Sequence, residues 1–144
     1  MSGWDAVTAI SGAFSAVVVT VACGYAAAQV REAKHARALQ SLVALHQEYQ
    51  APGLRVIRRR IRDGELGDFE SLTKEDAHAL EDLLQKLELV ALLASRGLVR
   101  SDDVMELFPS VPLIMAKVRP HVERRRLTQP SYARHALALA AQYP

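Results

Sequence analysis

The sequence is poor in the residues that disulfide-bonded, metal-dependent or loop-rich domains need. It holds one cysteine, Cys23, which excludes a disulfide framework and a zinc site built from several thiolates. Seven glycines and six prolines in 144 residues are too few for a loop-rich β-sandwich. Aromatic residues make up only 6% of the chain. The length fits one ordinary domain, and the abundance of alanine, leucine and arginine predicts an all-α fold.

Charge is nearly absent from the beginning of the chain and alternates in sign after it. Residues 1–28 hold a single charged side chain, Asp5. Residues 29–62 hold eight basic and two acidic side chains, residues 63–106 four and twelve, and residues 107–144 six and one. We therefore expect the acidic middle to pack against the basic segments on either side. The net charge of +2 gives no support to nucleic-acid binding.

The longest uncharged stretch is Ala6–Val30, twenty-five residues. As a helix it would span roughly 37 Å, enough for a hydrocarbon core of about 30 Å. Trp4 and Tyr25 lie near its two ends, where aromatic rings favour the membrane interface. The pattern predicts a single transmembrane helix within residues 1–30, continuing into an irregular cytoplasmic helical bundle formed by residues 31–144.

The flanking charges predict the orientation of this helix. Arg31, Lys34 and Arg37 follow it at once, whereas no lysine or arginine precedes it. The positive-inside rule then places the N-terminus outside and the rest in the cytoplasm, as in a single-pass protein of the inner membrane. A cleaved signal peptide or a lipoprotein, suggested by the run Val21–Cys23, would instead begin with a basic segment.

Small residues recur along the same helix at spacings of four. They predict a surface through which two membrane helices approach closely and form a homo-oligomer; its residues are Gly12, Ala16, Thr20, Gly24 and Ala28. The alternative is a soluble helical homo-oligomer whose N-terminal helices form the oligomer core.

Hydrophobic periodicity and breaker residues predict the remaining helices. Their expected ranges are 29–49, 52–63, 73–96, 101–108, 113–127 (interrupted or kinked at Pro120) and 130–142. Thr73 with Asp76 resembles a capping box, and Ser101 is expected to cap the fourth of these helices. In the helix ending at Arg96, the second half is apolar almost all round, which predicts the central element of the bundle.

Three stretches carry a resemblance to a known family. The runs Leu87–Phe108 (LELVALLASRGLVRSDDVMELF) and Val118–Arg126 (VRPHVERRR), with the earlier Glu48–Ile61 (EYQAPGLRVIRRRI), resemble an uncharacterised bacterial family, domain-of-unknown-function family 4760. The resemblance covers most of the chain after residue 30. It implies an N-terminal membrane helix, a cytoplasmic helical domain and a bacterial origin. It supplies no catalytic residue and no cofactor.

Candidate catalytic and metal-binding patterns are sparse. Two Glu-x-x-His matches occur, Glu32 with His35 and Glu75 with His78. A di-metal site needs such motifs to point into a bundle. At 100° per residue, Glu75 and His78 face away from Leu80 and towards solvent, while the other pair lies at the membrane edge. No phosphate-binding loop or nucleophile motif occurs. We expect no enzyme, metal or cofactor; a small enzyme of unrecognised type is the less favoured alternative.

Basic clusters are the most distinctive predicted surface. Arg55, Arg58, Arg59 and Arg62 share one helix face by their spacing. Three interpretations remain open. The arginines could pair with the acidic middle of the chain, including Asp63, Glu65 and Asp68, or they could contact anionic lipid. They could also bind nucleic acid, although the basic clusters contain no interleaved aromatic side chains on which bases could stack. Together with Arg31, Lys34 and Arg37, these residues form the predicted lipid or partner surface.

The sequence thus predicts a membrane-anchored helical interaction or scaffold module. Its expected partners are the lipid bilayer, an unknown cytoplasmic protein and a second copy of the chain.

Overall fold

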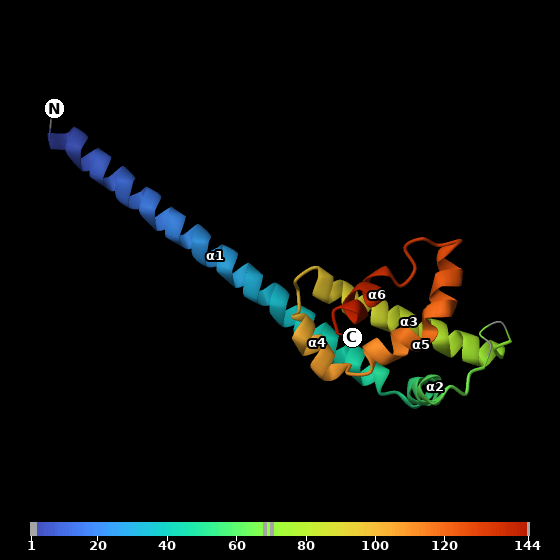
Figure 1. Cartoon of the computed structure of the whole chain (residues 1–144). Coiled ribbons are helices and arrows are strands. Elements are labelled where there is room, and N and C mark those ends of the chain that lie inside the picture. The colour runs from blue at the N-terminus through green and yellow to red at the C-terminus, as the bar shows by residue number, and fades with distance from the viewer. Residues whose placement is uncertain (1–2, 68, 70, 144) are drawn as a thin grey trace. The chain divides into compact units, whose positions relative to one another are not determined.

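The chain is helical in every regular element of the part that the structure describes. The computed structural model describes residues 3–67, 69 and 71–143, with side chains from Phe14 onward. Within these residues it holds six helices and no strand (Figure 1). Their bounds are α1 (Gly3–Tyr49), α2 (Pro52–Asp63), α3 (Lys74–Ser95), α4 (Ser101–Leu107), α5 (Val111–Arg126) and α6 (Arg134–Ala141). The all-α prediction is confirmed.

The chain divides into two units, residues 1–37 and 38–144. The first unit is formed by the N-terminal part of α1, and every side chain described there is exposed. The second unit is a bundle made by the last twelve residues of α1 and by α2–α6. Burial therefore begins within α1, at Ala38, which is 6% exposed.

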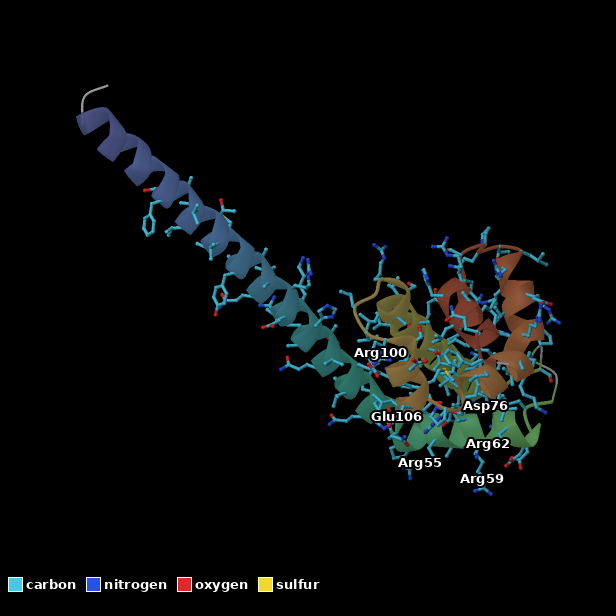
Figure 2. All side chains as sticks on the ribbon, turned by 60° about the vertical axis from the view of Figure 1, so that its left-hand side comes forward. Arg55, Arg59, Arg62, Asp76, Arg100 and Glu106 are labelled. Atoms are coloured by element: carbon cyan, nitrogen blue, oxygen red, sulfur yellow. The ribbon has the colours of Figure 1, made fainter. Side chains whose placement is uncertain are left out.

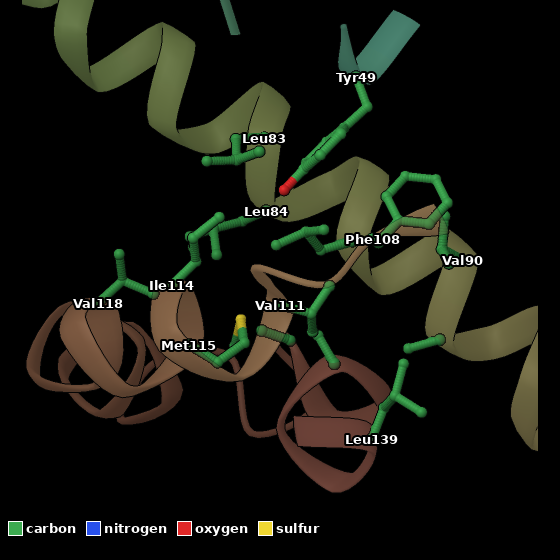
Figure 3. Packing of buried hydrophobic residues seen from close by; sticks show 14 of the residues in the cluster. Tyr49, Leu83, Leu84, Val90, Phe108, Val111, Ile114, Met115, Val118 and Leu139 are labelled. Atoms are coloured by element: carbon green, nitrogen blue, oxygen red, sulfur yellow. The ribbon is translucent and has the colours of Figure 1, made fainter. Parts of the chain in front are cut away.

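Helix α3 is the central element of the bundle. It packs against α2, α4 and α6, while α5 packs against α2 and α6. Its buried side chains are Leu80, Leu83, Leu84, Leu87, Val90 and Ala91. Figure 3 shows side chains from α1, α3, α5 and α6 meeting in this core, among them Tyr49, Leu83, Ile114 and Leu139. The prediction of a central helix ending near Arg96 is confirmed.

Local sequence signals fix several helix ends. Pro52 occupies the first turn of α2, where a missing N–H costs nothing, and Gly64 ends that helix in the left-handed conformation at φ 74°. The Thr73 hydroxyl accepts a hydrogen bond from the Asp76 amide at 3.1 Å, as the capping prediction requires. Gly97, just after α3, has φ 66°.

Other predicted boundaries are wrong. Ser101 does not cap α4: the chain is still extended at Arg100, so Ser101 is already helical. Helix α5 continues through Pro120, so the predicted interruption is wrong, whereas the alternative prediction of a kink there is not contradicted. The side chains of Val118 and Val122 are fully buried on either side, so packing holds the helix together despite the missing hydrogen bond.

The predicted core faces of α1 and α3 also need correction. The spacing of Leu39, Leu42 and Val43 predicts one buried face of α1, but Leu39 and Val43 are 48% and 51% exposed, because α1 turns Ala38 and Leu42 inward instead. In α3, Leu89 is 45% exposed. The second half of that helix is thus covered on one side rather than all round.

Replacing Leu87 by aspartate should unfold the bundle. Leu87 is 1% exposed, and an unpaired carboxylate at that position costs at least about 3 kcal/mol of unfolding free energy. Thermal unfolding of the full chain in detergent, followed by circular dichroism, measures the loss. Leu89→Asp, on the exposed side of the same helix, is the matched control and should change stability by less than about 1 kcal/mol. Equal melting curves for the two variants would contradict the position of the core.

Candidate functional site

Three of the four predicted arginines form an open basic face on α2. The side chains of Arg55, Arg59 and Arg62 are exposed and follow one another at spacings of four and three residues (Figure 2). The Arg55 guanidinium donates to the Gln50 carbonyl at 3.2 Å, and Arg59 lies 3.6 Å from Asp63 in a largely solvated pair. Such exposed pairs contribute little, so the face keeps its positive charge available to a partner.

Arg58 does not belong to this face, which corrects the prediction. Its side chain is 8% exposed, and its guanidinium lies over the Tyr49 ring at 3.7 Å from the centroid. The Nε donates to the Leu54 carbonyl at 3.2 Å, and Nη2 donates to Gln50 Oε1 at 3.4 Å. A weakly hydrated, planar cation can be buried against an aromatic ring. Arg58 therefore joins α2 to the end of α1.

The acidic middle does pair with the basic segments on both sides. Arg60 of α2 forms an ion pair with Asp76 at the beginning of α3. On the other side, Arg125 of α5 lies 2.7 Å from Glu81. Of the predicted partners of the α2 arginines, Asp63 pairs with Arg59 as described, whereas Asp68 lies outside the described residues. The expectation of internal charge matching is confirmed by these pairs.

The second predicted basic group lies in the other unit. Arg31, Lys34 and Arg37 are exposed on α1. They follow the apolar segment directly, which is where basic side chains meet lipid headgroups when a helix leaves a membrane.

The predicted small-residue surface is open in the single chain. Ala16, Thr20, Gly24 and Ala28 are exposed, and the Thr20 hydroxyl donates to the Ala16 carbonyl at 2.8 Å. A Cβ added at Gly24 would meet no atom within 4 Å. Gly12 lies in the stretch whose side chains are outside the described part. The homo-oligomer remains a prediction.

A polar cluster that the sequence did not reveal connects α3, α5 and the segment before α6. Glu81 accepts hydrogen bonds from Arg125 and from the Tyr132 hydroxyl, each at 2.7 Å. His121 places its Nε2 3.7 Å from the same carboxylate. The only local signal was the four-residue spacing of His121 and Arg125, because Glu81 and Tyr132 come from distant parts of the chain.

The environment of this cluster shifts the proton affinity of its members. Burial lowers the pKa of His121 despite the nearby Glu81 carboxylate. Burial and the hydrogen bond to Glu81 raise the pKa of Tyr132. At neutral pH the imidazole is thus neutral and the phenol protonated, and the hydrogen bonds of Glu81 connect α3 to α5 and to the segment before α6.

A second carboxylate fixes the start of α6. The two oxygens of Glu88 accept hydrogen bonds from the His135 and Ala136 amides at 3.1 and 2.8 Å. This contact caps a helix whose preceding residue, Ala133, is in the left-handed conformation at φ 50°. Helix α6 therefore begins at Arg134, four residues later than predicted.

The histidines of the sequence patterns lie apart from one another. Glu75 and His78 are exposed on α3, as helical geometry predicted, and His35 is exposed on α1. His46 is half-buried and meets the Phe108 ring edge-on, with centroids 5.4 Å apart. Its buried Nδ1 has no hydrogen-bond partner in the described part of the chain. No cluster of three or more potential metal ligands occurs among the described residues.

Two grooves on the bundle are lined mainly by apolar side chains. One of about 570 Å³ lies between the beginning of α5 and α6, beside Leu113 and Tyr143. The other, of about 310 Å³, lies along α3 beside Leu89 and Tyr132. Both offer apolar surface and few polar groups.

No protein-family model, curated protein or solved structure matches this chain. The resemblance to domain-of-unknown-function family 4760 accordingly stays a prediction.

Replacing Arg58 by alanine should destabilise the bundle more than replacing Arg59. The first change removes a buried cation from Tyr49 and two hydrogen bonds, which costs about 1–3 kcal/mol of unfolding free energy. The second removes a solvated pair and should stay within about 0.5 kcal/mol. Urea unfolding of both full-length variants in detergent measures the difference. A larger loss of unfolding free energy for Arg59→Ala than for Arg58→Ala would contradict the assignment of Arg58 as buried and structural and of Arg59 as exposed.

The lowered pKa of His121 predicts a pH-dependent stability. Below the unfolded-state pKa of 6.5, the unfolded chain binds a proton that the folded chain resists, so stability falls as the pH falls through this range. His121→Gln should flatten that part of the slope. Unfolding free energies measured between about pH 7.5 and 5 check this. An unchanged slope in His121→Gln would show that the imidazole is not held neutral.

Proposed function

We propose that this chain is a single-pass protein of the bacterial inner membrane, with its N-terminus outside and its helical domain in the cytoplasm. The domain serves as an interaction or scaffold module for a protein partner or a second copy, and catalyses no reaction.

The main support for a membrane anchor is the exposed apolar surface of α1. From Phe14 to Tyr49, this helix is long and apolar enough to cross a membrane, and none of its most apolar window is buried. A signal sequence or the core helix of a soluble protein meets the same criteria of length and composition. A core helix, however, hides its side chains, whereas Phe14, Val17 and Val21 are 61–71% exposed. A bilayer provides the apolar surroundings that these side chains need.

The charges beside this segment support the orientation and the contact with lipid. Arg31, Lys34 and Arg37 are exposed and follow the uncharged run, which favours the cytoplasmic side under the positive-inside rule. At the membrane surface, each of these three basic side chains contributes roughly 1 kcal/mol of attraction to anionic headgroups. The resemblance to the bacterial family supports the same topology.

The α2 face supports the partner-binding role. Arg55, Arg59 and Arg62 present three guanidinium groups on one rigid helix, beside Val56, which is 58% exposed. This combination of charge and apolar surface suits an acidic protein surface. The α2 face carries no exposed aromatic side chain on which nucleic-acid bases could stack.

Alkaline carbonate extraction of membranes from cells expressing the full chain tests the anchor. We expect the wild-type chain to stay in the membrane pellet. Val19→Arg combined with Ala22→Arg should release it, because each arginine at the centre of a membrane helix costs about 2.5–3.5 kcal/mol.

The matched control is Gln40→Arg combined with Ala44→Arg. These exposed positions lie on α1 beyond the proposed span, so this variant should stay in the pellet. Release of the wild-type chain would overturn the anchor and favour the soluble homo-oligomer.

A further inference from the structure

The larger of the two apolar grooves lies wholly within the second unit, between the beginning of α5 and α6. Its volume of about 570 Å³ is in the range of sites that hold small molecules. Eight of its ten lining residues have purely apolar side chains, and such a lining with few polar groups is typical of ligand sites. The groove thus has the size and the lining of a small-molecule site.

Small side chains on both helices keep this space open. Ala116 lines the groove from α5, and Ala140 and Ala141 line it from α6. Met115 also lines it and is 1% exposed, so the groove reaches down to the core (Figure 3). Leu113, another residue of the lining, is 44% exposed. An apolar ligand would remove this surface from water, which favours its binding.

Two side chains of the lining carry polar groups, and only one of them is available to a ligand. The Tyr143 hydroxyl already donates a hydrogen bond to Asp102 at 2.7 Å. Arg119 donates from Nε to Glu123 at 2.7 Å, but these side chains are 68% and 57% exposed, so the pair is weak. The two Nη groups of Arg119 have no hydrogen-bond partner among the described residues. The groove therefore offers one guanidinium and otherwise apolar surface.

This lining selects the chemical class of the ligand. A sugar, a nucleotide or a peptide carries many polar groups, and burying them without hydrogen-bond partners is costly. A long hydrocarbon chain with one anionic group leaves no polar group unpaired. Its chain fills the apolar part of the groove, and its carboxylate meets the planar fork of the guanidinium, which matches carboxylate geometry.

We propose that the groove between α5 and α6 binds a long-chain fatty acid. The hydrocarbon chain lies against Met115 and the alanines of both helices, and the carboxylate pairs with Arg119 at the solvent-exposed side. The inference goes beyond the proposed function and is independent of the membrane anchor, because every residue of the groove belongs to the second unit.

Photocrosslinking of the full chain tests the site. The chain is reconstituted into phosphatidylcholine nanodiscs and illuminated with a hexadecanoic acid that carries a diazirine in its chain, and mass spectrometry identifies the labelled peptides. We expect labelling of α5 and α6 that saturates and is suppressed by an excess of hexadecanoic acid. Labelling of α1 from the bilayer should not saturate, because it reports partition into lipid and not a site.

Filling the groove should abolish the saturable labelling. Ala116→Trp acts from α5 and Ala141→Trp from α6, and both positions are exposed, so the indole does not enter the core. Each variant should weaken binding at least about tenfold, because no room remains for the hydrocarbon chain. Ala44→Trp, at an exposed alanine of α1 outside the groove, is the matched control and should bind as the wild type does.

The role of the guanidinium is tested by a change of headgroup. Arg119→Gln should weaken binding of the acid about threefold, the factor of an exposed ion pair, and leave binding of the corresponding diazirine alcohol unchanged. Glu123→Gln removes the competing carboxylate and should strengthen binding of the acid about twofold. Arg96→Gln, at an exposed arginine after α3, is the charge-matched control and should change neither.

Three results would overturn the proposal. Labelling of α5 and α6 that does not saturate, or that persists in both tryptophan variants, would remove the site. Equal losses for the acid and the alcohol in Arg119→Gln would remove the anionic headgroup from it. Labelling of α1 alone would leave the membrane anchor intact and the groove open to an apolar segment of a protein partner. Saturable labelling of α5 and α6 with none of α1 would support the fatty-acid site and overturn only the anchor.

Discussion

The described side chains of α1 are exposed through residue 37 and buried on one face from Ala38 onward. This change divides the chain into its two units. From Phe14 to Arg37, the side chains of this helix are exposed, among them its valines. From Ala38 on, one face is buried by the bundle, and Leu42, Leu45 and Tyr49 become part of the core. A single helix thus begins as an exposed segment long and apolar enough to cross a membrane and ends as a structural element of the bundle.

Within the bundle, a few polar contacts between helices orient the apolar packing around α3. Arg58 over Tyr49 joins α1 to α2, and Asp76 with Arg60 joins α2 to α3. On the opposite side, Glu81 joins α3 to α5. These contacts use charges that the sequence displays as alternating blocks. Because Arg58 and Arg60 have internal partners, the exposed basic surface of α2 is narrower than the sequence pattern indicates and consists of Arg55, Arg59 and Arg62.

Features encoded locally could be predicted from the sequence, and features made by distant residues could not. Pro52, Gly64 and Thr73 act on the backbone within a few residues, so the ends of α2 and the start of α3 were predictable. The burial of Arg58 depends on a ring from another helix. Likewise, α6 begins where it does because Glu88, in α3, caps it from a distance. Of the candidate site, the exposed arginines were predictable from spacing, whereas the Glu81 cluster required the tertiary fold.

Cys23 allows a direct measurement of whether α1 lies in lipid. This residue is the single cysteine of the chain, it is exposed, and it lies within the proposed span. A nitroxide spin label attached to Cys23 in the full chain, reconstituted into phospholipid vesicles, reports its surroundings by collision with oxygen or with a water-soluble nickel chelate. Membrane insertion predicts frequent collisions with oxygen and few with nickel. The reverse ratio would contradict a membrane-spanning α1.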